Sequence, residues 1–213
     1  MERILIFQDA ANIEAAYREL MQQLDAPRKP LDQGNLLNYL AEGRFLVDAF
    51  CYLPVDPRRP MERVGIIGHL WESGWHVQEK LGKIVGDSYK CDLDVEMALD
   101  ILEICRDIRP DTVVICSGDE DFLPLIPRLR RLGIRVEMAS FTAAAARTMR
   151  RQASGFVDLD VYVAEWLGQQ NEPSDFCESA AEDDCGVVFF PSQTSNPSHT
   201  LYPSLRGNHH EDS

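Results

Sequence analysis

Acidic side chains stand where strand-like segments of this 213-residue chain end. Asp9 directly follows the first apolar run, and Asp119 and Asp121 follow a later one, within the sequence Ser-Gly-Asp-Glu-Asp-Phe. Asp94 stands near the start of a long helical pattern. Carboxylates that meet at the carboxyl ends of parallel strands repel one another unless a cation lies among them. The spacing therefore predicts that the four carboxylates together hold Mg²⁺ or Mn²⁺.

Polar residues beside these carboxylates are candidates for positioning them or a substrate. Ser117 can orient a carboxylate through its hydroxyl, and Asn12, three residues after Asp9, can position a ligand or a scissile phosphate. Lys90 closes a lysine-containing segment just before Asp94 and is a candidate phosphate contact. A single aspartate at a helix start is most often an N-cap. The density of acids after Ser117 exceeds what a cap requires.

The segments that must position these residues alternate between strand and helix. Strands are predicted at 3–8, 45–53, 75–81, 112–116, 135–140 and 156–159. Helices are predicted at 10–24, 33–42, 61–73, 92–108, 121–132 and 143–152, and a polar loop at 83–90. Such alternation implies βαβ crossovers. The expected fold class is α/β, with a mostly parallel sheet and helices on both of its faces.

Length and composition indicate one domain at residues 1–168 and a tail at 169–213. The tail is rich in Gln, Asn, Ser, Pro and acids, which predicts disorder. The chain has a net charge of −14, and residues 166–213, with eight acidic and one basic side chain, contribute −7 of it. Such a charge disfavours purely electrostatic binding of nucleic acid.

Local groups of basic residues can offset this charge at one surface. They form a candidate cationic rim for phosphates, with a solvated charged face as the alternative. The residues are Lys80, Lys83 and Lys90 around one loop, Arg128, Arg130 and Arg131 on one helix, and Arg147, Arg150 and Arg151 on another.

The cysteines indicate a reducing compartment, which we expect to be the cytoplasm. Cys51, Cys105 and Cys116 lie within apolar runs, where a reduced and buried thiol is at home, and the chain has no CxxC pair. No apolar run approaches the ~20 residues of a membrane span, and no export signal is visible. We therefore expect no membrane association.

Several motifs together resemble the NYN domain family, specifically its LabA/DUF88 branch. The third of the motifs is the most specific, and the resemblance spans about residues 3–163. The motifs are Phe7-Gln8-Asp9-Ala10-Ala11-Asn12, Lys90-Cys91-Asp92-Leu93-Asp94-Val95 with Asp100, the segment from Val114 to Leu125, Gly133-Ile-Arg-Val, and the segment from Ala153 to Asp160.

The resemblance implies a PIN-like nuclease fold and a magnesium-dependent ribonuclease acting on single-stranded or structured RNA. It implies that the four predicted carboxylates bind the metal and that Asn12 and Ser117 support them. The chain departs from the family motifs at two places near which substrate would approach. Ala10 replaces the usual glycine, and Cys91-Asp92-Leu93 replaces the Lys-Gly-Val sequence of the family.

Two other functions remain open from the residues. A regulatory module of the same fold would bind RNA or a nucleotide without turnover, and the acidic tail would recruit a protein partner. Phosphoryl or haloacid-type chemistry would use Asp9 as nucleophile, but the second acid that it requires two residues later is Ala11. No GxGxxG or P-loop motif is present, and His69 and His76 are predicted to be structural or half-exposed.

Overall fold

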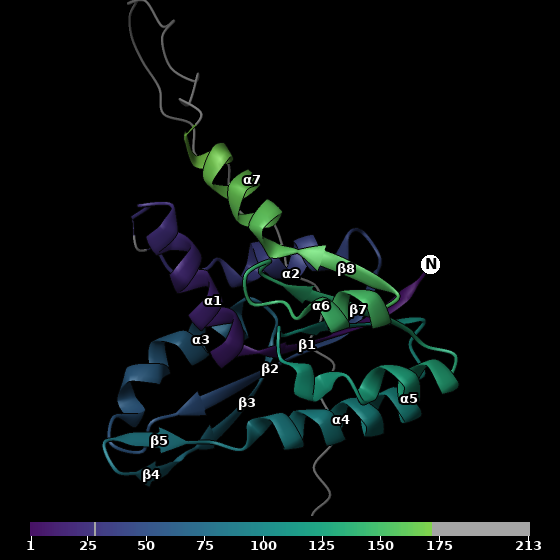
Figure 1. Cartoon of the computed structure of the whole chain (residues 1–213), viewed down its shortest axis with the longest axis horizontal. Coiled ribbons are helices and arrows are strands. Elements are labelled where there is room, and N and C mark those ends of the chain that lie inside the picture. The colour runs from purple at the N-terminus through teal and green to yellow at the C-terminus, as the bar shows by residue number, and fades with distance from the viewer. Residues whose placement is uncertain (28, 172–213) are drawn as a thin grey trace, which may run out of the picture. The chain divides into compact units, whose positions relative to one another are not determined.

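The structure, a computed structural model, describes residues 1–27 and 29–171. Its centre is a six-stranded sheet in the order β3-β2-β1-β6-β7-β8, and every neighbouring pair is parallel (Figure 1). The strands are β1 (Arg3–Asp9), β2 (Phe45–Val55), β3 (His76–Leu81), β6 (Thr112–Cys116), β7 (Arg135–Ser140) and β8 (Gly155–Asp158). The predicted α/β class is confirmed.

Helices cover both faces of the sheet, as predicted. One apolar core joins one face of the sheet to α1, α2, α3 and α7, and a second core joins the other face to α4, α5 and α6. The α-helices are α1 (Ala10–Gln23), α2 (Gln33–Ala41), α3 (Val64–Glu72), α4 (Leu93–Ile108), α5 (Leu125–Arg131), α6 (Arg147–Gln152) and α7 (Leu159–Asn171). Two 3-10 helices, η1 (Pro60–Arg63) and η2 (Glu120–Phe122), precede α3 and α5.

The strand order reverses between β1 and β6. From β1 the chain adds β2 and then β3 on one side, and it then crosses to add β6, β7 and β8 on the other side. Gln8 of β1 is paired with Cys116 of β6, so Asp9 and Ser117 both lie at the carboxyl edge of adjacent strands. In parallel sheets of this kind, ligands bind at the point where the order reverses.

The prediction of a polar loop at 83–90 is wrong. It is an antiparallel hairpin of β4 (Lys83–Val85) and β5 (Ser88–Lys90). Gly86 at the turn has a φ of +61°, a conformation that glycine adopts without steric cost. Short strands around a Gly-Asp turn carry little apolar periodicity, which explains why the pattern read as a loop.

Three helical predictions also need correction. The helix predicted at 61–73 is divided into η1 and α3, the one at 121–132 is divided into η2 and α5, and the one at 143–152 begins at Arg147. Helix α7 was not predicted. It runs to Asn171, so the first three residues of the predicted tail are helical, and the rest of the tail lies outside the described residues.

The buried thiols follow the prediction. Cys51, Cys105 and Cys116 are buried and free, and Cys91 is free and partly buried. Burial raises the pKa of the Cys51 and Cys105 thiols to about 12. Among the residues that the structure describes, no helix is long and apolar enough to cross a membrane.

Candidate metal site at the carboxyl edge of the sheet

Asp9 lies where β1 ends and α1 begins. Its Oδ1 accepts a hydrogen bond from the backbone N–H of Asn12 at 3.2 Å, so Asp9 is the N-cap of α1. Its Oδ2 accepts a hydrogen bond from Ser117 Oγ at 3.2 Å, and the residue is only 8% exposed. Both oxygens are therefore held by donors, and the carboxylate has a fixed orientation at the edge of the sheet.

Ser117 and Asn12 hold the turn that carries the second group of acids. The backbone N–H of Asp119 donates to Ser117 Oγ at 3.2 Å, and the backbone N–H of Gly118 donates to Asn12 Oδ1 at 2.8 Å. The hydroxyl of Ser117 thus links Asp9 to Asp119. The bond from Ser117 to Asp9 is the contact expected from the sequence. Asn12 instead holds the Gly118 turn, and its predicted contact with a ligand or scissile phosphate stays a prediction.

Gly118 is required by close packing rather than by its φ angle. A Cβ at this position would lie 2.4 Å from the backbone oxygen of Ala144, a distance that real Cβ atoms do not show. The loop after β7 therefore packs directly onto the turn that presents Asp119.

Replacing Gly118 with Ala should destabilise the fold by about 1–3 kcal/mol, because the added methyl group must displace backbone atoms. Urea unfolding of the variant and of Gly133→Ala measures this. Gly133 has open space around it but a φ of +82°, so its alanine variant separates backbone strain from overlap. Equal stability of Gly118→Ala and the unmodified protein would contradict the packing argument.

Burial and neighbouring acids raise the pKa of Asp9 to about 6. Loss of solvent makes the largest contribution, and the carboxylates of Asp94 and Asp119 add to it, while the bonds from Asn12 and Ser117 act in the opposite direction. A carboxyl group whose pKa lies this close to neutrality is typical of functional sites.

Asp94, Asp119 and Asp121 complete the acidic group. Asp94 is the second residue of α4, and its pKa is raised by burial and then by Asp119 and Asp121. Asp119 caps η2 by accepting the backbone N–H of Asp121 at 2.9 Å. Asp94 and Asp119 therefore lie within electrostatic range of Asp9, and Asp119 and Asp121 lie within electrostatic range of Asp94. Asp121 is the most exposed member.

The acidic group has no basic partner among the residues that the structure describes. None of the ion pairs among the described residues includes one of its four carboxylates. In the same part of the chain, no group of three or more His, Cys, Asp or Glu side chains is placed to hold a metal ion. Mg²⁺ is usually held by one or two carboxylates, with waters and substrate phosphates completing its shell. The hard oxygen donors and their uncompensated repulsion fit such an ion.

Lys90 ends β5 and its side chain is exposed, and no hydrogen bond or ion pair among the described residues joins it to the acidic group. Lys80 forms an ion pair with Glu96. The six arginines of α5 and α6 are all exposed, which leaves the predicted cationic rim available on those helices.

Two contacts near the site were not anticipated from the sequence. Thr148 Oγ1 donates to Glu120 Oε1 at 2.5 Å and so fastens α6 to the acidic turn. Tyr52 donates its hydroxyl to Asp100 Oδ2 at 2.8 Å, which joins β2 to α4. Both pairs are more than 25 residues apart in sequence, and no local pattern reveals them. His69 and His76 are exposed, and His76 pairs with Asp48 at 3.1 Å.

A model of the NYN domain family matches residues 3–160, which contain the whole sheet and the acidic group. The chain belongs to the NYN domain family. It therefore carries a nuclease-type domain, and the predicted resemblance is confirmed.

Two comparisons support this assignment of the NYN domain. The chain is 27% identical over 167 residues to the "Low amplitude and bright protein LabA" of Synechococcus elongatus, and the match covers 74% of this chain and 84% of that protein. The fold is similar to a solved protein of unknown function from Vibrio parahaemolyticus, with a TM-score of 0.61 and 27% identity, over 75% of this chain and 93% of the other.

Proposed function

We propose that the NYN domain is a Mg²⁺- or Mn²⁺-dependent ribonuclease that hydrolyses RNA phosphodiester bonds at the carboxyl edge of its sheet. The observation that carries the proposal is a group of carboxylates at the point where the strand order reverses. Among the described residues they have no basic partners, and one of them is buried with a pKa of about 6. Membership of a PIN-like nuclease family supports the same chemistry.

Each residue of the group has a proposed role. A bound divalent ion supplies an activated water and neutralises phosphoryl oxygens. Ser117 orients Asp9, and Asn12 holds the Gly118 turn, so both are positioning residues. Lys90 and the arginines of α6 are proposed to contact RNA phosphates. The residues proposed to hold the ion are Asp9, Asp94, Asp119 and Asp121.

Labelled single-stranded and hairpin RNA, incubated with the purified protein in Mg²⁺, in Mn²⁺ or in EDTA, tests this proposal. We expect cleavage only in the presence of a divalent ion. A DNA strand of the same sequence shows whether the 2′-hydroxyl is required. Tight binding of RNA without cleavage under all three conditions would favour the alternative, a binding module of the same fold.

Mg²⁺ or Mn²⁺ should also stabilise the folded chain. A ligand that binds only the native state at a hundredfold excess over its dissociation constant contributes about 2.7 kcal/mol. Thermal unfolding with and without the ion measures the shift, and Ca²⁺ serves as a larger ion for comparison. The variant with Asn at all four aspartates should show no shift. A shift that persists in that variant would place the ion elsewhere.

Two further expectations concern the cellular compartment and a protein partner. The free, buried thiols support residence in a reducing compartment such as the cytoplasm. A protein partner of the acidic tail stays a prediction, because the tail beyond residue 171 lies outside the described residues.

A further inference from the structure

Arginines gather on α5 and α6, although the chain as a whole has a net charge of −14. Residues 122–157 contain seven arginines and one acid, Glu137, which pairs with Arg44 and Arg135. The six arginines of α5 and α6 are exposed, and none of them forms an ion pair among the described residues. Their uncompensated charge marks a local surface for a polyanion. We call this surface the arginine face, and its residues are Arg128, Arg130, Arg131, Arg147, Arg150 and Arg151.

The arginine face adjoins the acidic group. Thr148 of α6 donates its hydroxyl to Glu120, which lies between two aspartates of the acidic group. On the other helix, Arg130 donates to Ser154 Oγ at 3.3 Å, two residues after α6 ends. Both helices also pack into one apolar core, on the face of the sheet that carries α4. The arginines therefore continue the surface on which the carboxylates lie.

One residue of the arginine face is already held against an aromatic ring. The guanidinium carbon of Arg150 lies over the ring of Phe156 in β8, 4.2 Å from the ring centroid. Phe156 packs against the apolar core, whereas Arg150 is exposed. A guanidinium held in this way loses less side-chain freedom when it binds, and proteins stack unpaired RNA bases on guanidinium planes. Arg150 is therefore placed to receive a base.

The strand register sets the distance between this ring and the acidic group. Phe156 is paired with Met138 of β7, and Met138 is paired with Ile115 of β6, two residues before Ser117. At about 4.8 Å between strands and about 3.3 Å per residue, Phe156 lies about 12 Å from Ser117. A strand in a nucleic-acid helix advances about 3.4 Å per nucleotide, so this distance corresponds to about three or four nucleotides.

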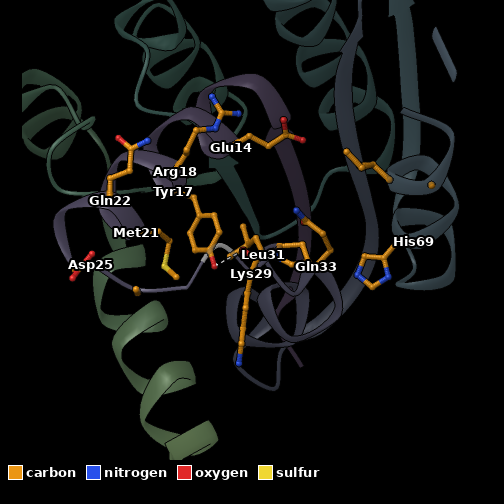
Figure 2. Close-up of a pocket in the computed structure, with 14 residues that line it drawn as sticks. Glu14, Tyr17, Arg18, Met21, Gln22, Asp25, Lys29, Leu31, Gln33 and His69 are labelled. Atoms are coloured by element: carbon orange, nitrogen blue, oxygen red, sulfur yellow. Dashed lines mark hydrogen bonds between the residues drawn. The ribbon is translucent and has the colours of Figure 1, made fainter. Parts of the chain in front are cut away.

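The opposite face of the sheet carries a different feature. A cavity of about 720 Å³ opens there between α1, the segment that joins α1 to α2, and α3, as Figure 2 shows. Its lining mixes the acids Glu14 and Asp25 with basic residues, and Glu14 is paired with Arg63. Its charges are thus more evenly balanced than those of the arginine face. The more cationic route for a phosphate chain away from the acidic group therefore crosses α5 and α6.

We propose that an RNA strand runs from the acidic group across the arginine face and stacks one base on the guanidinium of Arg150. That base is about the third or fourth from the phosphodiester at the acidic group. The inference rests on the proposed function and adds to it the direction in which the strand leaves the site. Bases within a duplex are already stacked and paired, so this contact selects an unpaired segment.

Conservative variants of two neighbouring arginines test the stacking contact. Arg150→Lys keeps the charge but removes the plane. Arg151→Lys is its control, since the Arg151 side chain makes no ring contact, hydrogen bond or ion pair among the described residues. Binding of the full-length chain to a fluorescent single-stranded RNA of about 12 nucleotides is measured by anisotropy in EDTA. We expect Arg150→Lys to weaken binding about tenfold and Arg151→Lys to change it by less than about twofold, with thermal unfolding confirming that both are folded.

RNA that lacks a single base tests the contact without altering the protein. In an RNA whose cleavage position has been mapped in Mn²⁺, removal of the third or fourth base on one side of that position should weaken binding in EDTA about tenfold. The same removal should change binding to Arg150→Lys by less than about twofold, because the stacking partner is already lost. Equal losses in the two proteins would overturn the stacking contact.

Cleavage of a dinucleotide in Mn²⁺ separates this inference from the proposed function. A dinucleotide does not reach Arg150, so Arg150→Lys and the unmodified protein should cleave it equally. If RNA is cleaved but the two lysine variants bind it equally, the inference is overturned and the ribonuclease proposal stands. If Arg150→Lys weakens RNA binding but no divalent ion supports cleavage, the ribonuclease proposal fails and Arg150 remains an RNA contact. Unchanged RNA binding after replacement of all six arginines by Gln would assign the arginine face to another polyanion, such as an acidic protein segment, and overturn the inference.

Discussion

Replacing Asp119 with Asn should lower the proposed metal-dependent RNA cleavage by about a thousandfold, which corresponds to about 4 kcal/mol in the activation free energy. The substitution removes one negative ligand from the proposed ion site. It keeps an oxygen able to accept the backbone N–H of Asp121, so the cap of η2 survives. The loss therefore falls on the chemical step and not on folding. Single-turnover cleavage of labelled RNA in Mn²⁺ measures it.

A matched control is Asp107→Asn on α4. Asp107 is an exposed carboxylate, and no hydrogen bond or ion pair among the described residues involves it. The Asp107→Asn variant should cleave RNA at the same rate as the unmodified protein. If the Asp119→Asn and Asp107→Asn variants cleaved RNA at the same rate, Asp119 would not belong to the metal site. Both variants should still bind RNA in EDTA, which shows that the RNA-binding surface is intact.

Replacing Asp9 with Asn should stabilise the metal-free protein by about 3 kcal/mol at pH 8. The folded-state pKa of Asp9, about 6, lies above its ordinary value of 3.8, so ionisation is harder in the folded chain than in the unfolded chain. Ionisation of Asp9 therefore lowers the free energy of unfolding. This loss is absent below about pH 4, grows between pH 4 and 6, and is complete above pH 6. Asparagine carries no charge and is an equally good N-cap, so it removes the cost and retains the cap.

Denaturant unfolding in EDTA at pH 4, 6 and 8 checks this dependence. The stability difference between Asp9→Asn and the unmodified chain should be small at pH 4 and largest at pH 8. The same variant should lose cleavage in Mg²⁺, so its stability and activity change in opposite directions. A stability difference that does not vary with pH would show that burial and the neighbouring acids do not raise the pKa of Asp9.

Much of the fold can be read from local patterns, because buried parallel strands are continuous apolar runs. The run at Thr112–Cys116 is fully buried in β6, and β1 is buried in the same way.

Helix α7 was missed although its sequence contains the signal. Leu159, Tyr162, Val163 and Trp166 are buried at helical spacing, but they directly follow a short strand motif that seemed to end the domain.

The positions of the acidic group could be predicted from the sequence for a simple reason: each of its members lies close to the end of a strand or to the start of a helix. The contact between Asp9 and Ser117 depends on β1 and β6 being neighbours, and strand order is a property of the whole sheet. The cavity between α1 and α3 was beyond prediction, since residues of its lining such as Gly65 and Gln33 come from separate elements whose packing no motif records.

The two outer strands of the sheet also bear on how this protein avoids unwanted association. Strand β3 presents the charged side chains of Glu79 and Lys80 along with His76, and β8 contains only four residues. Exposed sheet edges template aggregation when they are long, flat and apolar. A charged edge on one side and a very short one on the other give a second chain little to pair with. The sheet is thereby protected against edge-to-edge growth into fibrils.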